Sequence, residues 1–157
     1  MSNGNVFISG ASRGIGNSIA YHFAENDYVV VGTSRNEFEF DKKIKNLIPV
    51  KLDVTSREDI QNCFNDLKTK NLLPDILINN AGITSDQIFL RMKDEEWDKV
   101  IDTNLNGVFN LSKIFVKNMI KNKKGRIINI SSISGLMGTP GQVNYSSSKS
   151  ALNGFTK

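Results

Sequence analysis

Short apolar runs rich in β-branched residues alternate along the chain with longer stretches whose apolar residues recur at helical spacing. The short runs predict five buried strands, at residues 6–8, 28–31, 50–52, 76–78 and 127–130. Strands separated by helices imply a parallel sheet that is joined by right-handed crossovers and covered on both faces. We therefore expect an α/β fold, a doubly wound, Rossmann-like parallel sheet in a single domain spanning residues 1–157.

Two of the predicted helices are defined by apolar residues that share one face. These residues are Ile15, Ile19, Ala20 and Phe23 in the first helix and Ile60, Phe64 and Leu67 in the second. Ser56 and Asp59 resemble a capping signal, so the second helix should begin directly after Ser56.

The longest helical pattern runs from Asp94 to Asn122. Its apolar residues recur at intervals that fit one continuous helix. The expected stripe comprises Trp97, Val100, Ile101, Leu105, Phe109, Ile114 and Met119. We expect this stripe to face the interior of the protein.

A glycine-rich segment directly follows the first expected strand, where residues 9–16 read Ser-Gly-Ala-Ser-Arg-Gly-Ile-Gly. Glycines let backbone N–H groups approach a pyrophosphate, and the helix that follows adds partial positive charge. The spacing G-x-x-x-G-x-G differs from the general dinucleotide fingerprint, so the strand–loop–helix context favours dinucleotide binding over an ordinary turn. The residues expected to contact the cofactor here are Gly10, Ser12, Arg13, Gly14, Ile15 and Gly16.

The end of the second expected strand bears on the choice of nicotinamide cofactor. An acidic residue there would bind the ribose hydroxyls of NAD, but this strand ends in Arg35, which with Arg13 can pair with the 2′-phosphate of NADP(H). Glu37 keeps NAD open as an alternative. We also expect Asp53 and Val54 to contact the cofactor; Asp53 could accept a hydrogen bond from the adenine amino group or simply form a turn.

Polar and small residues follow the next two strands. Asn80, Ala81 and Gly82 come after the fourth strand and are expected beside the cofactor ribose, with simple turn chemistry as the alternative. Ser131 and Ser132 come after the fifth strand. Doubly wound sheets bind ligands beyond the carboxyl ends of their strands, so these segments should meet at one edge.

Tyr145 and Lys149 lie one turn apart on the same face of a further expected helix. A phenol is a poor base at neutral pH, but an adjacent ammonium stabilises the phenolate and lowers the tyrosine pKa. Tyr145 could then give a proton to an alkoxide, while Ser132 bonds the substrate carbonyl. Because hydride transfer belongs to a nicotinamide, this combination predicts reduction of a ketone to a secondary alcohol.

The composition of the chain limits its possible binding partners, its location and its metal sites. The net charge of +4 is mild, and basic and aromatic residues are not interleaved as in nucleic-acid modules, so we expect no nucleic-acid partner. No apolar run approaches the length of a membrane span, and the N-terminus lacks a secretion signal, so we expect a cytoplasmic protein and no membrane partner. Cys63 and His22 are the only residues of their types, which argues against a metal site and makes structural or surface roles the better interpretation of both.

Together these motifs resemble the short-chain dehydrogenase/reductase family over nearly the whole chain. Within it, the chain is most similar to the branch that reduces 3-oxoacyl thioesters on acyl carrier protein in bacterial fatty-acid synthesis. The stretches that carry this resemblance are Gly-Ile-Thr-Ser-Asp at 82–86, Arg-Met-Lys-Asp-Glu-Glu-Trp at 91–97, Asn-Leu-Asn-Gly-Val-Phe at 104–109 and Gly-Gln-Val-Asn-Tyr at 141–145.

The resemblance implies a catalytic tetrad of Asn104, Ser132, Tyr145 and Lys149. Tyr145 would be the acid/base, and Lys149 would lower its pKa and hold the cofactor ribose. Asn104 would position a water in the proton relay, at a bend in the long helix. The resemblance further implies a homotetramer in which the long helix and the helix bearing Tyr145 pack between subunits.

The substrate of such a reductase is a small ketone or an acyl group on an acidic carrier protein. A basic cluster near the end of the long helix comprises Lys117, Lys121, Lys123, Lys124 and Arg126. This cluster could dock the carrier, or it could be a solvated helix end whose lysines suit the C-terminal dipole.

The chain departs from the family in length, because members are typically longer and this sequence stops at Lys157, within the helix expected to carry Tyr145. We therefore expect a truncated fold whose last two strands, substrate lid and one wall of the nicotinamide pocket are absent, leaving the fifth strand as an open edge. These residues alone should have little activity and should aggregate. The alternatives are a reductase of acetoacetyl-CoA, a steroid, a sugar or another small ketone, and an inactive dinucleotide-binding fragment.

Overall fold

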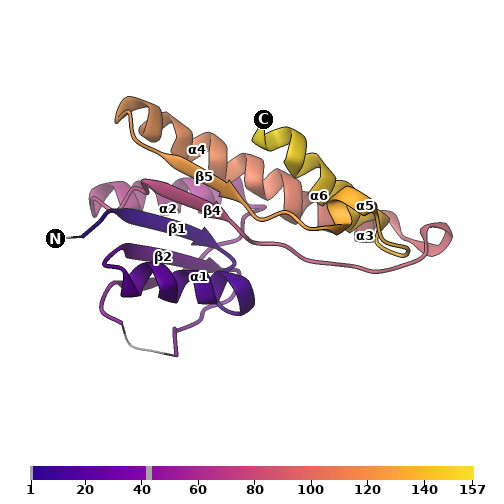
Figure 1. Ribbon diagram of the computed structural model, residues 1–157, viewed down its shortest axis with the longest axis horizontal. Coiled ribbons are helices and arrows are strands. Elements are labelled where there is room, and N and C mark those ends of the chain that lie inside the picture. The colour runs from indigo at the N-terminus through magenta and orange to yellow at the C-terminus, as the bar shows by residue number, and fades with distance from the viewer. Residues whose placement is uncertain (1, 42–43) are drawn as a thin grey trace.

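A computed structural model describes residues 2–41 and 44–157 (Figure 1). Its centre is a five-stranded parallel sheet with the strand order β3-β2-β1-β4-β5. The strands are β1 (Asn5–Ser9), β2 (Val29–Ser34), β3 (Leu47–Lys51), β4 (Ile76–Asn79) and β5 (Arg126–Asn129). All five predicted strands are present, and the doubly wound parallel sheet is confirmed.

The central strand β1 explains why the sheet needs cover on both faces. Val6, Phe7 and Ile8 are all fully buried, because their side chains point alternately to the two sides. Val6 and Ile8 pack in one hydrophobic core, and Phe7 packs in the other. A strand buried on both faces reads as a continuous apolar run, which is the pattern that predicted it.

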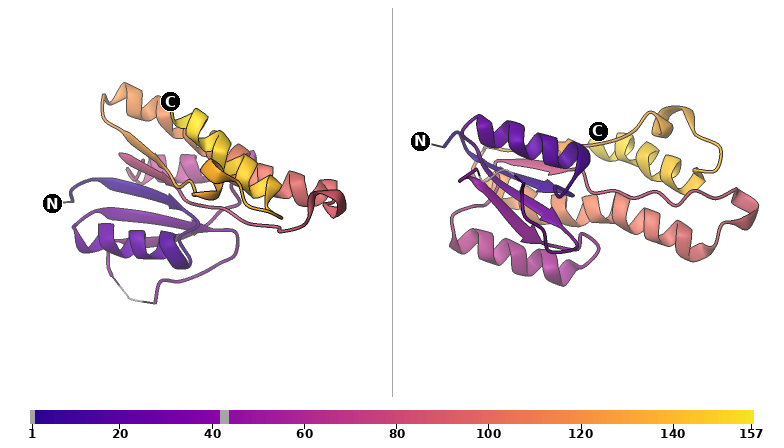
Figure 2. Two further views of the ribbon diagram at one scale, coloured as in Figure 1. Left: turned by 45° about the vertical axis from the view of Figure 1, so that its right-hand side comes forward. Right: turned by 90° about the horizontal axis from the view of Figure 1, so that it is seen from below.

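Helices on the two faces complete these cores (Figure 2). Helix α1 (Gly14–Glu25) buries Ala20 and Ala24 in the core that contains Val6. Helices α2 (Arg57–Thr69) and α4 (Gly107–Lys121) cover the opposite face, where Leu67 and Phe115 pack with Phe7. The helix that joins β1 to β2 thus lies on one side of the sheet, and the helices that join β3 to β4 and β4 to β5 lie on the other.

The prediction that Ser56 caps the second helix is confirmed, and the prediction that Ile15 belongs to the buried face of the first helix is wrong. Ser56 caps α2, since its hydroxyl oxygen accepts a hydrogen bond from the backbone N–H of Asp59 at 3.1 Å. Ile15, in contrast, does not join the buried face of α1 and is 63% exposed. It sits in the first turn of α1, beside the cavities described below rather than over the sheet.

The long helical region is interrupted rather than continuous. It comprises α3 (Asp94–Ile101), a π-helical turn η2 (Asp102–Asn106) and α4. A π-helical turn spaces hydrogen bonds five residues apart, so it shifts the helix face that follows it. The predicted stripe is consequently wrong at Phe109, which is 41% exposed; the apolar residues that α4 buries are Val108, Leu111, Phe115 and Met119.

The part of the chain around α3 projects beyond the carboxyl edge of the sheet (Figure 1). It includes a short helical turn η1 (Phe89–Arg91), α5 (Ser134–Met137) and α6 (Val143–Thr156). In the strand order, β5 is one of the two edge strands of the sheet, and β3 is the other. None of the helices in the described ranges is long and apolar enough to cross a membrane.

Candidate active site

Three loops converge at the carboxyl edge of the sheet, after β1, β4 and β5. Strand order reverses between β1 and β4, which lie side by side although they are distant in the sequence. Doubly wound folds bind their ligands at this switch point, and the predicted segments that follow β1 and β4 lie there.

The loop after β1 is held in a tight turn by Asn80. Gly10 and Gly14 have φ values of 70° and 60°, a region that glycine enters without strain. The side-chain amide of Asn80 donates to the carbonyls of Ser9, at 3.1 Å, and Gly10, at 2.8 Å. A Cβ at Gly16 would lie 2.2 Å from the Gly10 carbonyl oxygen, so Gly16 serves the packing of this turn.

A cavity of about 410 Å³ opens over this loop. Most of the predicted cofactor residues line it, including Arg13, Arg35 and Val54. The sequence predictions did not include Thr33, Ser34, Leu52, Ile83 and Thr103, which also line it. Thr33 and Ser34 are the last two residues of β2. Their position at the carboxyl end of a strand, the same signal that identified Ser131 and Ser132, could have predicted them.

Asp53 lies outside this cavity and lines an adjoining one with Arg35. Its Oδ1 atom accepts hydrogen bonds from the backbone N–H and the hydroxyl of Thr55, at 2.9 and 2.8 Å. The turn expected as the alternative for Asp53 is therefore present. An adenine contact through its other carboxylate oxygen stays a prediction.

A second cavity of about 440 Å³ joins the glycine loop to the helix that bears Tyr145. Arg13, Ile15, Asn80 and Gly82 line both cavities, while Tyr145 and Lys149 line only the second. Segments from the first and last thirds of the chain thus surround one continuous space. A dinucleotide bound over the glycine loop would extend toward the phenol.

Lys149 is almost completely buried, with 4% exposure. Its Nζ atom donates a hydrogen bond to the carbonyl of Ile130 at 2.7 Å and lies 5.8 Å from the centre of the Tyr145 ring. Burial lowers the pKa of this ammonium, because a low-dielectric environment disfavours charge. The stabilisation of a Tyr145 phenolate by this ammonium stays a prediction.

The two serines after β5 differ in position. Ser131 lines the second cavity, and its hydroxyl donates to the carbonyl of Lys149 at 2.9 Å. Ser132 is half-buried, and its hydroxyl accepts a hydrogen bond from the backbone N–H of Ser134 at 3.2 Å. The Ser132 hydroxyl retains its own proton for a substrate carbonyl, so its assignment as the carbonyl-binding serine stays a prediction.

Asn104 is fully buried in the π-helical turn η2. Its amide oxygen accepts from the N–H of Ile83 at 2.8 Å, and its amide nitrogen donates to the Ile83 carbonyl at 3.0 Å and to the Ser148 hydroxyl at 3.1 Å. These bonds tie η2 to the loop after β4 and to α6. Because the side chain is committed in this way, any water that Asn104 positions would be bound by its backbone carbonyl.

Asn144 was not among the predicted site residues. It is fully buried, its amide oxygen accepts from the N–H of Tyr145 at 2.7 Å, and its amide nitrogen donates to the Ser85 carbonyl at 3.0 Å. It therefore anchors the first turn of α6 to the loop after β4. Its place directly before Tyr145 was the only signal in the sequence.

Cys63 and His22 lie outside both cavities. Cys63 packs against the core between α2 and α4, and burial raises its thiol pKa to about 11. A thiol with this pKa is protonated at neutral pH and is a poor nucleophile. His22 is exposed on α1 beside Phe23, so the structural and surface roles predicted for these residues fit their positions.

The fold and this arrangement define a dinucleotide-binding α/β protein, and comparison with known proteins identifies its family. A family model described as short chain dehydrogenase matches residues 4–157. The chain belongs to the short-chain dehydrogenase family.

Curated relatives specify the branch that the chain resembles. It is 43% identical over 156 residues to the 3-oxoacyl-acyl-carrier-protein reductase FabG of Escherichia coli (strain K12), and 42% identical over 156 residues to that of Vibrio cholerae serotype O1. In both cases the match covers 97% of this chain and 64% of the relative. The chain thus spans about two thirds of the length of these reductases.

Solved structures support the fold independently. A structure described as 4-hydroxyisoleucine dehydrogenase complexed with NADH has a TM-score of 0.89 and 39% sequence identity. The match covers 98% of this chain and 66% of that chain. A second structure of that enzyme, with NADH and succinate, gives a TM-score of 0.87.

Proposed function

We propose that this chain catalyses NADPH-dependent reduction of a 3-oxoacyl thioester, carried on an acyl carrier protein, to the 3-hydroxyacyl form. The observation that carries the proposal is the cavity that joins the glycine loop to Tyr145 and Lys149. Two further observations support the proposal: the chain belongs to the short-chain dehydrogenase family, and it is about 40% identical to 3-oxoacyl-acyl-carrier-protein reductases.

The reaction adds a hydride to the ketone carbon and a proton to the ketone oxygen. Bound nicotinamide supplies the hydride. Tyr145 donates the proton from its phenol, and Lys149 stabilises the phenolate that remains. Ser132 donates a hydrogen bond to the ketone oxygen, where negative charge grows as the hydride arrives. The backbone carbonyl of Asn104 holds a water that returns a proton to Tyr145.

Within this proposal the cofactor is NADP(H), held by Arg35 and Arg13. Both arginines line the first cavity, where a guanidinium can pair with a 2′-phosphate. Arg35→Asp should raise the KM for NADPH by roughly 10- to 100-fold, the loss expected for a charge-assisted hydrogen bond, and spare the KM for NADH. Lys68→Asp is the control with the same charge change, because Lys68 is exposed in the last turn of α2 and does not line the cavity. Equal KM changes for both cofactors would contradict the assignment.

The carrier partner is proposed to bind the basic cluster of Lys117, Lys121, Lys123, Lys124 and Arg126. Lys124 is already paired with Asp75 at 3.1 Å, which leaves Lys123 as the better candidate for a carrier contact. Helix α4 has 15 residues and separates this cluster from Asn104 by about 22 Å at the usual rise. A carrier docked there would serve the site of a neighbouring subunit more readily, which fits a homotetramer packed through α4 and α6.

A reductase or dehydrogenase of another small hydroxy compound is the second candidate, because the chain is 39% identical to 4-hydroxyisoleucine dehydrogenase. Loss of NADPH absorbance, measured with a 3-oxoacyl-carrier thioester and with a small ketone, separates the two. Because the chain spans about two thirds of the length of these reductases, we expect only slow turnover with the thioester, and its loss in Tyr145→Phe. Turnover with the small ketone alone would favour the second candidate. An absence of turnover with both, together with retained NADPH binding, would indicate a non-catalytic dinucleotide-binding chain.

A further inference from the structure

Thr33 has a buried hydroxyl without a hydrogen-bond partner. Its side chain is fully buried, and its Oγ1 atom bonds no donor or acceptor among the described residues. Ser9, the residue opposite Thr33 on β1, shows the usual arrangement. The buried Ser9 hydroxyl accepts hydrogen bonds from the backbone N–H groups of Asn80, at 3.1 Å, and Ala81, at 3.0 Å. An unpaired buried hydroxyl is destabilising, so its presence at the end of β2 requires a physical cause.

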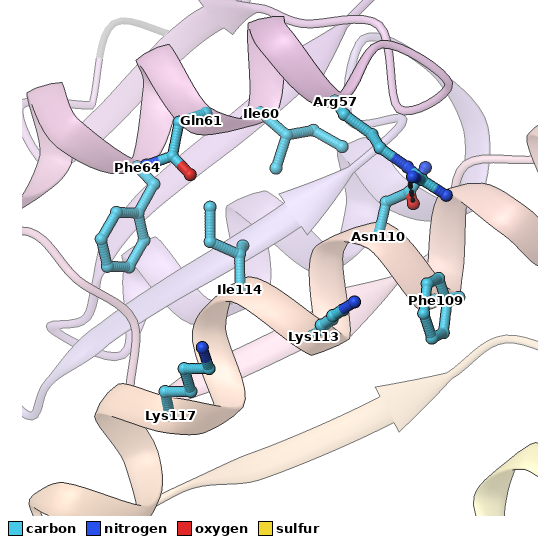
Figure 3. A pocket seen from close by; sticks show the side chains of 9 residues that line it. All are labelled: Arg57, Ile60, Gln61, Phe64, Phe109, Asn110, Lys113, Ile114 and Lys117. Atoms are coloured by element: carbon cyan, nitrogen blue, oxygen red, sulfur yellow. Dashed lines mark hydrogen bonds between the residues drawn. The ribbon is translucent and has the colours of Figure 1, made fainter.

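This unpaired atom belongs to the cavity over the glycine loop, which Thr33 lines with Arg35 and Val54. Two other buried side-chain atoms in the described part of the chain have no partner, Asn79 Oδ1 and Ser146 Oγ, and neither residue lines a cavity of the candidate active site. Figure 3 shows a further hollow, between α2 and α4, and none of these three residues lines it. Thr33 thus combines an unsatisfied polar atom with a place in a cavity.

Packing does not require a hydroxyl at this position. Thr33 lies on the same face of β2 as Val31, which packs in the core with Leu52 and Val54. Valine has the branched shape of threonine and would fill the position without a polar atom. The backbone carbonyl of Thr33 accepts a hydrogen bond from the N–H of Ala11 at 2.8 Å, and a valine would keep this bond. Neither the strand nor the core therefore accounts for the hydroxyl.

We propose that the Thr33 hydroxyl binds the adenosine half of the dinucleotide cofactor, an inference that rests on the proposed function. Because the proposed proton transfer places the nicotinamide beside Tyr145, which lines only the second cavity, the adenosine half belongs in the first cavity with Thr33. A hydroxyl can both donate and accept a hydrogen bond. Adenosine offers amino and hydroxyl donors as well as ring-nitrogen acceptors, so it can supply the partner that the protein itself does not.

Thr33 and Arg35 should affect cofactor binding differently. Arg35 is proposed to pair with a 2′-phosphate, which NADPH carries and NADH lacks. The adenosine half is common to both cofactors, so Thr33→Val should weaken NADPH and NADH binding equally, by about 3- to 10-fold, the range of one hydrogen bond. Thr33→Val should not change the affinity for reduced nicotinamide mononucleotide, which lacks adenosine.

Calorimetric titration of the purified protein with NADPH, NADH and ADP-ribose tests the inference. ADP-ribose has no nicotinamide, so its affinity reports on the adenosine half without any turnover. Thr33→Ser keeps a hydroxyl and should bind ADP-ribose within about threefold of the unmodified protein. Thr69→Val is the matched control, because Thr69 is exposed at the end of α2 and lines neither cavity.

Urea unfolding without ligand gives a readout that separates a binding role from a structural one. Thr33→Val removes an unpaired buried hydroxyl and its desolvation cost, so it should raise the urea midpoint while it weakens ADP-ribose binding. A lowered midpoint would show that the hydroxyl is paired within the protein, and unchanged ADP-ribose affinity would show that solvent satisfies it; either result would overturn the inference.

The unmodified protein separates the failure of this inference from that of the proposed function. If it binds neither NADPH nor NADH, the proposed function and the role of Thr33 fail together. If it binds them and Thr33→Val binds them equally well, only the role of Thr33 fails.

Discussion

The ammonium of Lys149 donates a hydrogen bond to the backbone carbonyl of Ile130 at 2.7 Å, which joins α6 to the residue directly after β5. This bond fixes the position of a buried charge next to Tyr145. The orientation of the lysine is thus set by the backbone of the sheet edge and not by another charged side chain. A charge held in this way is available to stabilise a phenolate.

The lowered pKa of Lys149 predicts how stability depends on pH. The unfolded chain retains the ordinary lysine pKa of 10.5, and the folded chain has a lower value. Between these two values the unfolded state binds more protons, so the free energy of unfolding should rise with pH across that window. Urea unfolding at a series of alkaline pH values measures this rise.

Lys149→Met should abolish this rise, whereas Lys121→Met, which changes an exposed lysine at the end of α4, should retain it. Lys149→Met should also lower the rate of ketone reduction by about 100-fold or more, the usual contribution of acid–base assistance. In the unmodified protein, reduction should slow as pH rises through the lowered pKa of Lys149, since the neutral amine no longer stabilises the phenolate. A pH profile of kcat that is the same in Lys149→Met would refute this role.

Asn104 should contribute more to stability than its size suggests. Replacing it with Ala removes three hydrogen bonds and deprives the half-buried N–H and carbonyl of Ile83 of their side-chain partner, a loss of about 2–4 kcal/mol in the free energy of unfolding. Asn106→Ala is the matched control in the same turn, because Asn106 is exposed and its side chain bonds the nearby Asp102. Its effect should be about 0.5 kcal/mol or less. Similar urea unfolding curves for the two variants would contradict the bridging role.

Gly16 and Gly154 provide a paired test of the glycine loop. A Cβ at Gly16 would lie 2.2 Å from the Gly10 carbonyl oxygen and 2.4 Å from the amide nitrogen of Asn80, so Gly16→Ala should displace the loop and weaken NADPH binding. A Cβ at Gly154 meets nothing within 4 Å, and Gly154→Ala within α6 should raise the free energy of unfolding by about 0.5–1 kcal/mol. Unchanged NADPH fluorescence on binding to Gly16→Ala would show that the loop does not contact the cofactor.

The raised pKa of Cys63 predicts slow reaction with thiol reagents. At neutral pH the thiol is protonated, because burial and the nearby Asp66 carboxylate both disfavour the thiolate. Iodoacetamide labelling followed by mass spectrometry should therefore accelerate as the pH rises toward about 11. Fast labelling at neutral pH would indicate an activated thiol and reopen the possibility of a nucleophilic role.

The fold was predictable because its signals are local. The buried strands read as apolar runs, and each loop at the carboxyl edge follows its strand directly in the sequence. Parallel strands end at one edge, so Gly10, Asn80 and Ser131, which follow β1, β4 and β5, could be assigned to one site without any knowledge of distances. The cavities that join them bear out this convergence.

The features that were not predicted depend on contacts between distant segments. Asn144 bonds the carbonyl of Ser85, a residue far away along the chain, and nothing in the neighbourhood of Asn144 indicates this partner. Phe109 fits an apolar stripe, but its exposure depends on a turn whose key residue bonds Ile83. Ile15 was assigned to a buried face, although it lies where the helix begins and the cavities open.

The π-helical turn η2 makes the chain length between α3 and α4 critical. Each residue of a helix advances the following side chains by about 100°, so a single deletion within residues 102–106 would turn every later position of α4 by that angle. Leu111 and Phe115 would then swing away from the sheet, and Asn104 would lose its register with Ile83. Substitutions in this turn alter single contacts, whereas a one-residue deletion would disrupt both the hydrophobic core and the active site.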